Sequence, residues 1–214
     1  MLVPSRSSTR YCWIATASLG CVLIPSATGA GPVGVGFRVG APLRPVLEGS
    51  EPWYRPVRHP AAWGASLEIR FSDRWALEAN ALYRKLSYEL LAEVVGAARP
   101  KVRTGRWEFP VLVKHRWGGF PLAPYLSAGL AWNRTRDPTV NAASLDSSQL
   151  PPLEFRHARA WGPAAAAGIE LPLLVIRLGV EVRYTHWGER NFGTRGSPLR
   201  STLDQLELLL GLTF

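Results

Sequence analysis

The sequence predicts an all-β protein, an eight-stranded antiparallel up-and-down transmembrane β-barrel. Three observations lead to this fold class. Eight segments alternate apolar and polar residues with a period of two, which places the two kinds of residue on opposite faces of a strand. The links between these segments are alternately short and long. The last segment, 203–214, alternates from end to end and finishes on Phe214.

The first three expected strands are 33–40, 63–71 and 75–85. Each sets valine, leucine or another apolar residue against glycine, serine or a charged residue at alternate positions. The first strand, for example, has Phe37 on the apolar face and Arg38 on the polar face. Such strands are typical of a sheet whose two faces meet different surroundings.

The fourth and fifth expected strands, 106–117 and 124–133, show the clearest internal alternation. In the fourth, Trp107 and Phe109 lie on one face and Glu108 lies on the other. In the fifth, leucine, alanine and tryptophan alternate with serine, glycine and asparagine. Both segments are therefore expected to be half apolar and half polar.

The last three expected strands are 161–171, 174–186 and 203–214. The first of them is rich in alanine, which has modest β-propensity, so a short helix is an alternative there. The second alternates from Ile176 to Tyr184. The closing strand places leucines and the terminal phenylalanine on one face.

The links between the strands fall into two series that alternate along the chain. Outer-membrane barrels combine short periplasmic turns with longer outside loops, and closing the sheet removes its edges. Within the long links only 87–95 is periodic, and it is either a strand extension or a short helix. No second domain is indicated. The short links are 72–74, 118–121 and 171–173, and the long links are 41–62, 86–105, 134–160 and 188–202.

The first thirty residues are typical of an export signal. Arg6 and Arg10 form a basic start, 11–24 is apolar, and small residues precede position 31. The apolar stretch is too short for a comfortable membrane-spanning helix. We therefore expect a signal peptide at 1–30 and a barrel domain at 31–214.

Both cysteines, Cys12 and Cys21, lie in the expected signal peptide. The remainder of the chain has no cysteine, which excludes disulfides, thiolate metal sites and a cysteine nucleophile there. Lipoprotein processing at Cys21 is an alternative, but Ser18 stands where the processing motif usually has an aliphatic residue.

The polar face of the strands is expected to point into the barrel and form an ionic network. Seven basic and six acidic residues lie on this face. Isolated buried charge is costly, so these side chains are expected to pair. Eight strands enclose side chains rather than a wide channel, and general porin activity is not expected. The expected lumen residues are Arg38, Glu68, Arg70, Glu78, Arg84, Glu108, Lys114, Arg116, Glu170, Arg177, Glu181, Arg183 and Glu207.

The apolar face is expected to point outward, with aromatic residues near the strand ends, where membrane interfaces lie. A soluble, lipocalin-like barrel would have the opposite arrangement, with apolar residues inside. The export signal, the terminal aromatic residue and the alternating link lengths favour the membrane barrel. The expected interfacial aromatics are Trp63, Trp75, Trp107, Trp117, Trp132 and Tyr184.

The chain is basic, with a formal net charge of +9, which becomes +7 without the two arginines of the signal. Fourteen basic and eight acidic residues lie in and next to the long links, in the spans 41–62, 88–106, 134–160 and 188–202. A basic outer rim suits the phosphates of lipopolysaccharide, for which arginine is well adapted. Solvated loops without a specific ligand are the alternative. The basic residues are dispersed and no recognition element is present, so nucleic acid is not an expected partner.

No catalytic centre or cofactor site is evident, and we expect a protein that is not an enzyme. The four histidines lack metal-ligand spacing, and neither a nucleophile elbow nor a phosphate-binding loop is present. Small outer-membrane lipid A deacylases carry His-x-Ser near the outer end of a late strand. His186 has a similar setting, but Gly188 stands where the nucleophilic serine is needed.

The chain resembles the small outer-membrane β-barrel family that includes OmpA-like and PorT-like domains. This resemblance implies the outer membrane of a Gram-negative-type bacterium, and it implies that Phe214 acts as a signal to the barrel-assembly machinery. It implies no single activity, because a fold by itself does not specify function. The segments that carry the resemblance are Val33–Pro42, Trp107–Lys114, Pro124–Gly129, Val180–Tyr184 and Leu210–Phe214.

These observations predict a monomeric barrel in contact with outer-membrane lipid. Its expected role is structural, or one of surface interaction through four long outer loops. Two alternatives stay open at this point: a soluble periplasmic barrel that binds a ligand, and a narrow ion-conducting pore.

Overall fold

A computed structural model describes most of the chain that follows the expected signal peptide. The expected signal, 1–30, and the central parts of the long links lie outside the described residues. Within the described residues, no helix has the length and apolarity needed to cross a membrane. The described residues are 32–49, 54–56, 60–90, 101–118, 121–136, 139–141, 157–173, 175–191, 193 and 199–214.

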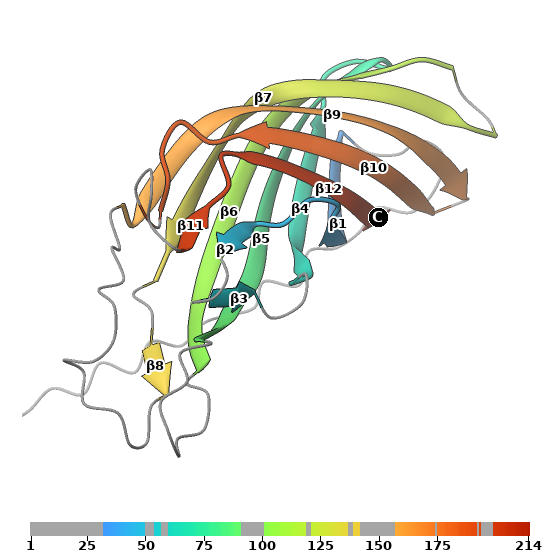
Figure 1. Cartoon of the computed structure of the whole chain (residues 1–214). Helices are drawn as coiled ribbons and strands as arrows, with labels where there is room; N and C mark the ends of the chain where they lie inside the picture. Colours follow the sequence, from blue (N-terminus) through green and yellow to red (C-terminus); the bar gives the residue numbers. More distant parts are fainter. Residues whose placement is uncertain are drawn as a thin grey trace, which may run out of the picture.

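In this part of the chain, eight long strands form a closed antiparallel barrel (Figure 1). Each long strand pairs with the next along the chain, and the last, β12, pairs with the first, β1. Closure gives every long strand two neighbours and leaves no free edge. The strands are β1 (Val33–Pro42), β4 (Ala62–Arg70), β5 (Trp75–Leu90), β6 (Lys101–Arg116), β7 (Ala123–Thr135), β9 (Arg159–Leu173), β10 (Ile176–His186) and β12 (Asp204–Thr213).

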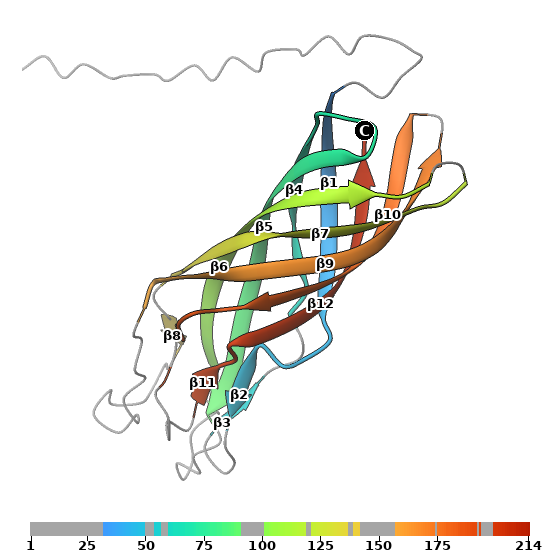
Figure 2. The same ribbon diagram turned by 90° about the horizontal axis from the view of Figure 1, so that it is seen from above.

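The two ends of the barrel are different (Figure 2). The end of β4, the start of β5, the end of β6 and the start of β7 lie at the end that also holds the start of β1 and the C-terminus, which we call the short-turn end. The opposite end, the long-loop end, carries four three-residue strands (Figure 2). These are β2 (Leu47–Gly49), β3 (Tyr54–Pro56), β8 (Thr139–Asn141) and β11 (Leu199–Ser201).

The short strands join the long links to one another and to the barrel. β2 pairs with β11, so the first long link is connected to the last. β3 continues the sheet beside β5, and β8 does the same beside β6. The described parts of the long-loop end are therefore hydrogen-bonded to the barrel or to each other.

The β5–β6 hairpin is longer than the sequence predicts. Pairing continues from Lys85 opposite Gly105 to Glu89 opposite Lys101. The ambiguous segment that begins at Ser87 is therefore strand up to Leu90. Its outer part lies beyond the described residues.

The alanine-rich segment is strand β9, and the helix alternative is wrong for it. β9 pairs with β7 from Arg159 to Glu170 and with β10 from Ala164 to Leu173. Two flanking strands satisfy its backbone groups, and this tertiary pairing overrides the modest β-propensity of alanine.

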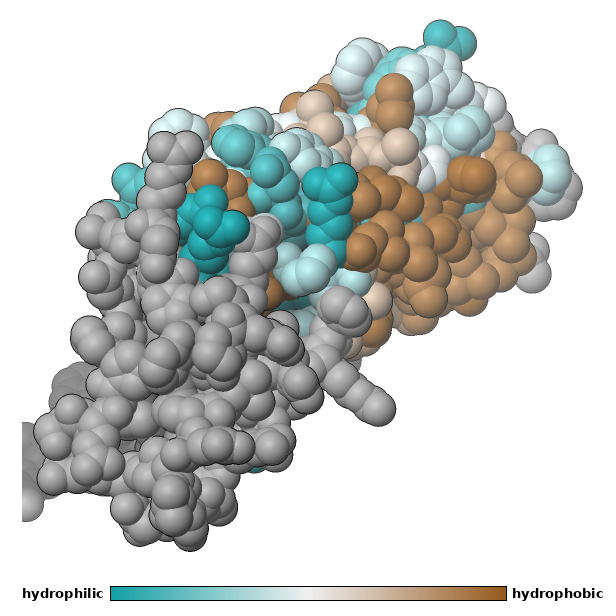
Figure 3. Space-filling view, in the orientation of Figure 1, coloured by the Kyte–Doolittle hydropathy of each residue, from teal (hydrophilic) through white to brown (hydrophobic). Residues whose placement is uncertain are grey.

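Inside and outside of the barrel carry opposite kinds of side chain. Outward residues such as Val35 and Leu130 are more than half exposed, whereas Arg84 and Lys114 are completely buried in the lumen. Figure 3 shows apolar side chains gathered over one part of the visible surface, beside more polar ones. The distribution between inside and outside is the reverse of that in a soluble barrel, because the apolar surface faces the surroundings.

Candidate functional site: the lumen and its two rims

The structure places all thirteen predicted lumen residues inside the barrel, where each makes at least one ion pair. Together with Arg106, which was not predicted, they form three layers along the barrel axis, named by position. The short-turn layer contains Glu68, Arg70, Arg116, Glu170 and Arg177; the middle layer contains Arg38, Glu78, Glu181 and Arg183; the long-loop layer contains Arg84, Arg106, Glu108 and Glu207; Lys114 lies between the first two layers.

In the short-turn layer, several cations share two carboxylates. Glu68 Oε1 accepts hydrogen bonds from Arg177 Nη1 at 2.7 Å and from Arg70 Nε at 3.0 Å. Arg116 donates through Nε to Glu170 at 2.9 Å and also pairs with Glu68. Each carboxylate therefore serves more than one guanidinium group.

In the middle layer, two arginines and two glutamates alternate. Arg38 bridges Glu78 at 2.6 Å and Glu181 at 2.8 Å. Arg183 contacts the same two carboxylates, at 3.5 Å and 2.6 Å. The Tyr125 hydroxyl donates to Glu181 at 2.7 Å. The ring of four charges is therefore balanced.

Lys114 connects the middle and short-turn layers. Its Nζ lies 2.9 Å from Glu170 and 3.1 Å from Glu68, and it also pairs with Glu78. The ammonium group lies 4.4 Å from the centroid of the Tyr125 ring, within cation–π range. A single buried cation thus contacts three carboxylates.

The long-loop layer is balanced too. Glu108 pairs with Arg84 at 3.3 Å and with Arg106 at 3.2 Å, and Arg84 also pairs with Glu207. The Gln205 amide donates to Glu108 at 3.0 Å. Each charge in this layer has an opposite charge within reach.

Trp187 lies over the long-loop layer and is 2% exposed. Its indole N–H donates to Gln205 at 2.9 Å, and the Arg106 guanidinium lies 4.6 Å from its ring centroid. The ring packs with Leu112 and three small residues in one buried cluster. An apolar plug therefore occupies the lumen at this level.

Sequence reasoning missed both Trp187 and Arg106. Arg106 is two residues before Glu108, so strand parity alone would have placed it inside. Trp187 follows the last residue of β10 and has the same parity as the inward residues Arg183 and Thr185, so continuing the alternation past the predicted end of the strand would have placed it inside. The predicted polar lumen also contains apolar side chains, among them Leu82 and Leu209.

With Arg106 included, eight basic and six acidic side chains of the described residues lie in the lumen ion pairs. The middle and long-loop layers contain equal numbers of each sign. The excess of two positive charges therefore belongs to Lys114 and the short-turn layer.

The predicted interfacial aromatics form two belts on the outer wall. Towards the long-loop end, the ring centroid of Tyr83 lies 5.9 Å from that of Trp63 and 5.2 Å from that of Trp107. Phe109 lies 5.8 Å from Trp132 in the same belt. Tyr184 lies on β10 near this end, and its hydroxyl donates to Asp204 at 2.6 Å.

The second belt lies at the short-turn end. There the ring of His115 lies 4.4 Å from Trp75 and 4.6 Å from Trp117. The two belts therefore lie at opposite ends of the outer wall.

Just beyond the long-loop belt, five exposed basic side chains point outward. Arg134 and Arg159 are directly opposite each other on β7 and β9, and the next outward pair towards the middle of the barrel is Trp132 opposite Trp161. None of the five makes an ion pair with a described residue. This basic rim consists of Lys85, Arg103, Arg134, Arg136 and Arg159.

His186 lies on the outward face, with its Nδ1 2.8 Å from Asp204 Oδ1. The nearby Gly188 has no side chain, and its backbone N–H donates to the Trp161 carbonyl. No nucleophile stands at the position that a deacylase would need. Among the described residues, no group of three metal-binding side chains occurs.

Comparison with curated proteins finds a relative in the outer membrane. The 25 kDa outer-membrane immunogenic proteins of Brucella abortus and Brucella suis are 34% identical to the chain over 95 residues, which is 44% of this chain and 39% of each relative. The chain thus matches well under half the length of these relatives. No family model matches.

Solved structures agree on the fold. OprG from Pseudomonas aeruginosa aligns with a TM-score of 0.59 at 13% identity, over 85% of this chain and 92% of that chain. A major outer membrane protein from Thermus thermophilus aligns with a TM-score of 0.50 at 10% identity, over 85% and 98%. The predicted eight-stranded antiparallel barrel is confirmed.

The chain is therefore an outer-membrane β-barrel protein of the Gram-negative type. The predicted location is confirmed, and the soluble periplasmic alternative is wrong, because the charged face lies inside the barrel and the apolar face outside.

Proposed function

We propose that this barrel has a structural and surface-interaction role, and that its long-loop end binds the phosphate groups of lipopolysaccharide. Outer-membrane barrels place short turns in the periplasm and longer loops outside, which assigns the long-loop end to the cell surface. The basic rim then lies at the level of the outer-leaflet headgroups.

The pair of Arg134 and Arg159 carries this proposal. Like charges directly opposite on neighbouring strands repel each other, and neither arginine has an ion-pair partner among the described residues. A phosphate between them would relieve the repulsion and accept several N–H donors from each guanidinium. The neighbouring pair of Trp132 and Trp161 suits the glycolipid interface just below.

The filled lumen supports a structural role over conduction. Three layers of buried ion pairs and the Trp187 ring occupy it. Planar-bilayer measurements are expected to show no steady conductance from the wild-type protein. A stable open channel would favour the narrow-pore alternative.

The terminal strand supports a further part of the proposal. Phe214 ends the chain beside β1, is 65% exposed, and its backbone N–H donates to the Val35 carbonyl. An exposed terminal aromatic suits recognition of β12 by the barrel-assembly machinery before closure. We include this role, a monomeric state and a relationship to OmpA-like and PorT-like domains in the proposal.

The lipopolysaccharide contact is tested with folded protein in an uncharged detergent and purified lipopolysaccharide. A double variant, Arg134→Gln with Arg159→Gln, is expected to bind at least about tenfold more weakly, since each basic residue near an anionic lipid surface contributes about 1 kcal/mol. Raising the salt concentration is expected to reduce wild-type binding.

Arg74→Gln is the matched control, because it removes one exposed arginine at the opposite end of the barrel. Dephosphorylated lipopolysaccharide tests the chemistry: wild type and double variant are expected to bind it equally. The proposal would be refuted if the wild type and the Arg134→Gln, Arg159→Gln double variant bound intact lipopolysaccharide equally well.

A further inference from the structure

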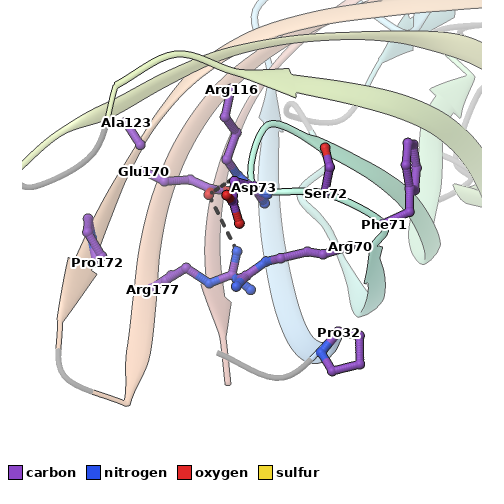
Figure 4. Close-up of a pocket in the computed structure, with 10 residues that line it drawn as sticks. All are labelled: Pro32, Arg70, Phe71, Ser72, Asp73, Arg116, Ala123, Glu170, Pro172 and Arg177. Atoms are coloured by element: carbon purple, nitrogen blue, oxygen red, sulfur yellow. Dashed lines mark hydrogen bonds and ion pairs between the residues drawn. The ribbon is translucent and has the colours of Figure 1, made fainter. Parts of the chain in front are cut away.

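A cavity of about 570 Å³ opens at the short-turn end of the lumen (Figure 4). Its volume falls within the range of small-molecule sites. Its polar lining includes three arginines from three strands, namely Arg70 at the end of β4, Arg116 at the end of β6 and Arg177 at the start of β10. Glu170 and Asp73 are the two acidic residues of the lining.

The arginines of the cavity are not fully neutralised by their neighbours. Arg70 and Arg177 use the same oxygen of Glu68, and Arg116 divides its donors between Glu68 and Glu170. Figure 4 shows the head groups of Arg70 and Arg177 directed towards each other. Two like charges that share one carboxylate oxygen retain a net positive charge.

Unused donors are also present at this site. Arg70 bonds to Glu68 through Nε alone, so its two terminal nitrogens have no partner among the described residues. The bonds of Arg177 use Nη1 only. Both side chains are partly open to the cavity, with exposed fractions of 19% and 14%. The free N–H groups therefore adjoin the open space.

We propose that this cavity binds a phosphoryl oxyanion, presented either as inorganic phosphate or as the headgroup of an inner-leaflet phospholipid. A tetrahedral oxyanion offers acceptors to several guanidinium groups at once, a geometry that arginine favours. It would also supply the negative charge that the short-turn layer lacks. Asp73, on the exposed turn before β5, limits the positive charge at the entrance.

The cavity and the basic rim can be tested independently of each other. The cavity lies at the other end of the barrel, inside the wall rather than outside, and shares no residue with the rim. Failure of one proposal therefore leaves the other unaffected.

In the first experiment, inorganic phosphate is titrated into the folded full-length barrel in an uncharged detergent at low ionic strength, and the heat of binding is measured by calorimetry. No lipopolysaccharide is present. Arg177→Gln and Arg70→Gln are each expected to weaken binding at least tenfold. Arg74→Gln is the control. Arg74 is an exposed arginine next to Asp73 in the turn before β5, and its side chain does not line the cavity. Heat-modifiable gel migration verifies that each variant is folded.

The second experiment distinguishes the two sources of phosphate. Protein in mixed micelles that contain phosphatidylglycerol is examined by native mass spectrometry for retained lipid. If inorganic phosphate binds to the wild type and this binding is lost in Arg70→Gln and in Arg177→Gln, the ligand is the free phosphate anion. Retention of phosphatidylglycerol that is lost in both variants, without binding of inorganic phosphate, supports a lipid headgroup.

A wild-type protein that binds neither probe would overturn the inference. Equal binding by the wild type and the folded Arg70→Gln variant would overturn it as well. Arg70 has one hydrogen bond and is partly exposed, so this variant keeps the test valid if Arg177→Gln does not fold.

Discussion

The two ends of the lumen use the same side chains to different effect. At the long-loop end, Arg84 and Arg106 match Glu108 and Glu207, and Trp187 covers them. At the short-turn end, three arginines and Lys114 share two glutamates beside an open cavity. A balanced and covered layer leaves no group for a ligand, whereas an unbalanced layer beside a cavity leaves both charge and donors.

The comparison also shows where stability is concentrated. Removing one partner from a balanced buried pair leaves an uncompensated charge and costs about 3 to 5 kcal/mol. In a layer with an excess of cations, one cation can be removed and every carboxylate still has a partner. The two ends should therefore respond differently to the same chemical change.

The largest effect is expected from removing the plug. Trp187→Ala empties a buried space beside Leu112, and a buried tryptophan replaced by alanine costs about 3 to 5 kcal/mol. Urea unfolding in micelles, followed by gel migration, measures the loss. Trp161→Ala is the control, because that ring is 67% exposed on the outer wall and its loss leaves no buried cavity. Equal unfolding midpoints for the two variants would show that Trp187 is not a structural plug.

The next largest effect sharpens the contrast between the ends. Arg106→Gln is expected to lower the free energy of unfolding by about 3 kcal/mol, because it unbalances the long-loop layer. Arg70→Gln is expected to change it by less than about 1 kcal/mol, because Glu68 keeps three other cations. Both are measured by the same unfolding assay. Equal losses would mean that charge balance does not distinguish the two layers.

A smaller effect than that of Arg106→Gln concerns the middle layer, between the two ends. Tyr125 lies opposite Gly168, and a Cβ on that glycine would come within 2.5 Å of the phenol ring. Gly168→Ala is therefore expected to move the hydroxyl away from Glu181 and cost about 1 to 3 kcal/mol, as overpacking does. Gly179→Ala is the matched control, because its added Cβ would meet its nearest neighbour at 3.8 Å. A loss as small as that of the control would contradict the expected clash.

The alternation of residues determined most of the fold from the sequence. Each of the eight predicted strands is present, with the predicted polar face inside the barrel and the predicted apolar face outside. The physical reason is local: a side-chain period of two assigns faces without knowledge of any partner strand. Boundaries were less accurate where pairing continued beyond the hydrophobic pattern, as it does between Lys85 and Glu89 on β5.

The sequence by itself determined the class of fold, the order of the strands and all but one of the charged residues in the lumen ion pairs. Only the tertiary structure decided how those charges divide into layers, because pairing depends on the register between strands far apart in the chain. Arg38, for instance, meets Glu78 on β5 and Glu181 on β10. The same register brought Arg134 opposite Arg159, and the packing of the barrel interior set Trp187 against Gln205 and Arg106. A one-dimensional pattern fixes which face a residue occupies, but the neighbours on that face follow from closure of the barrel.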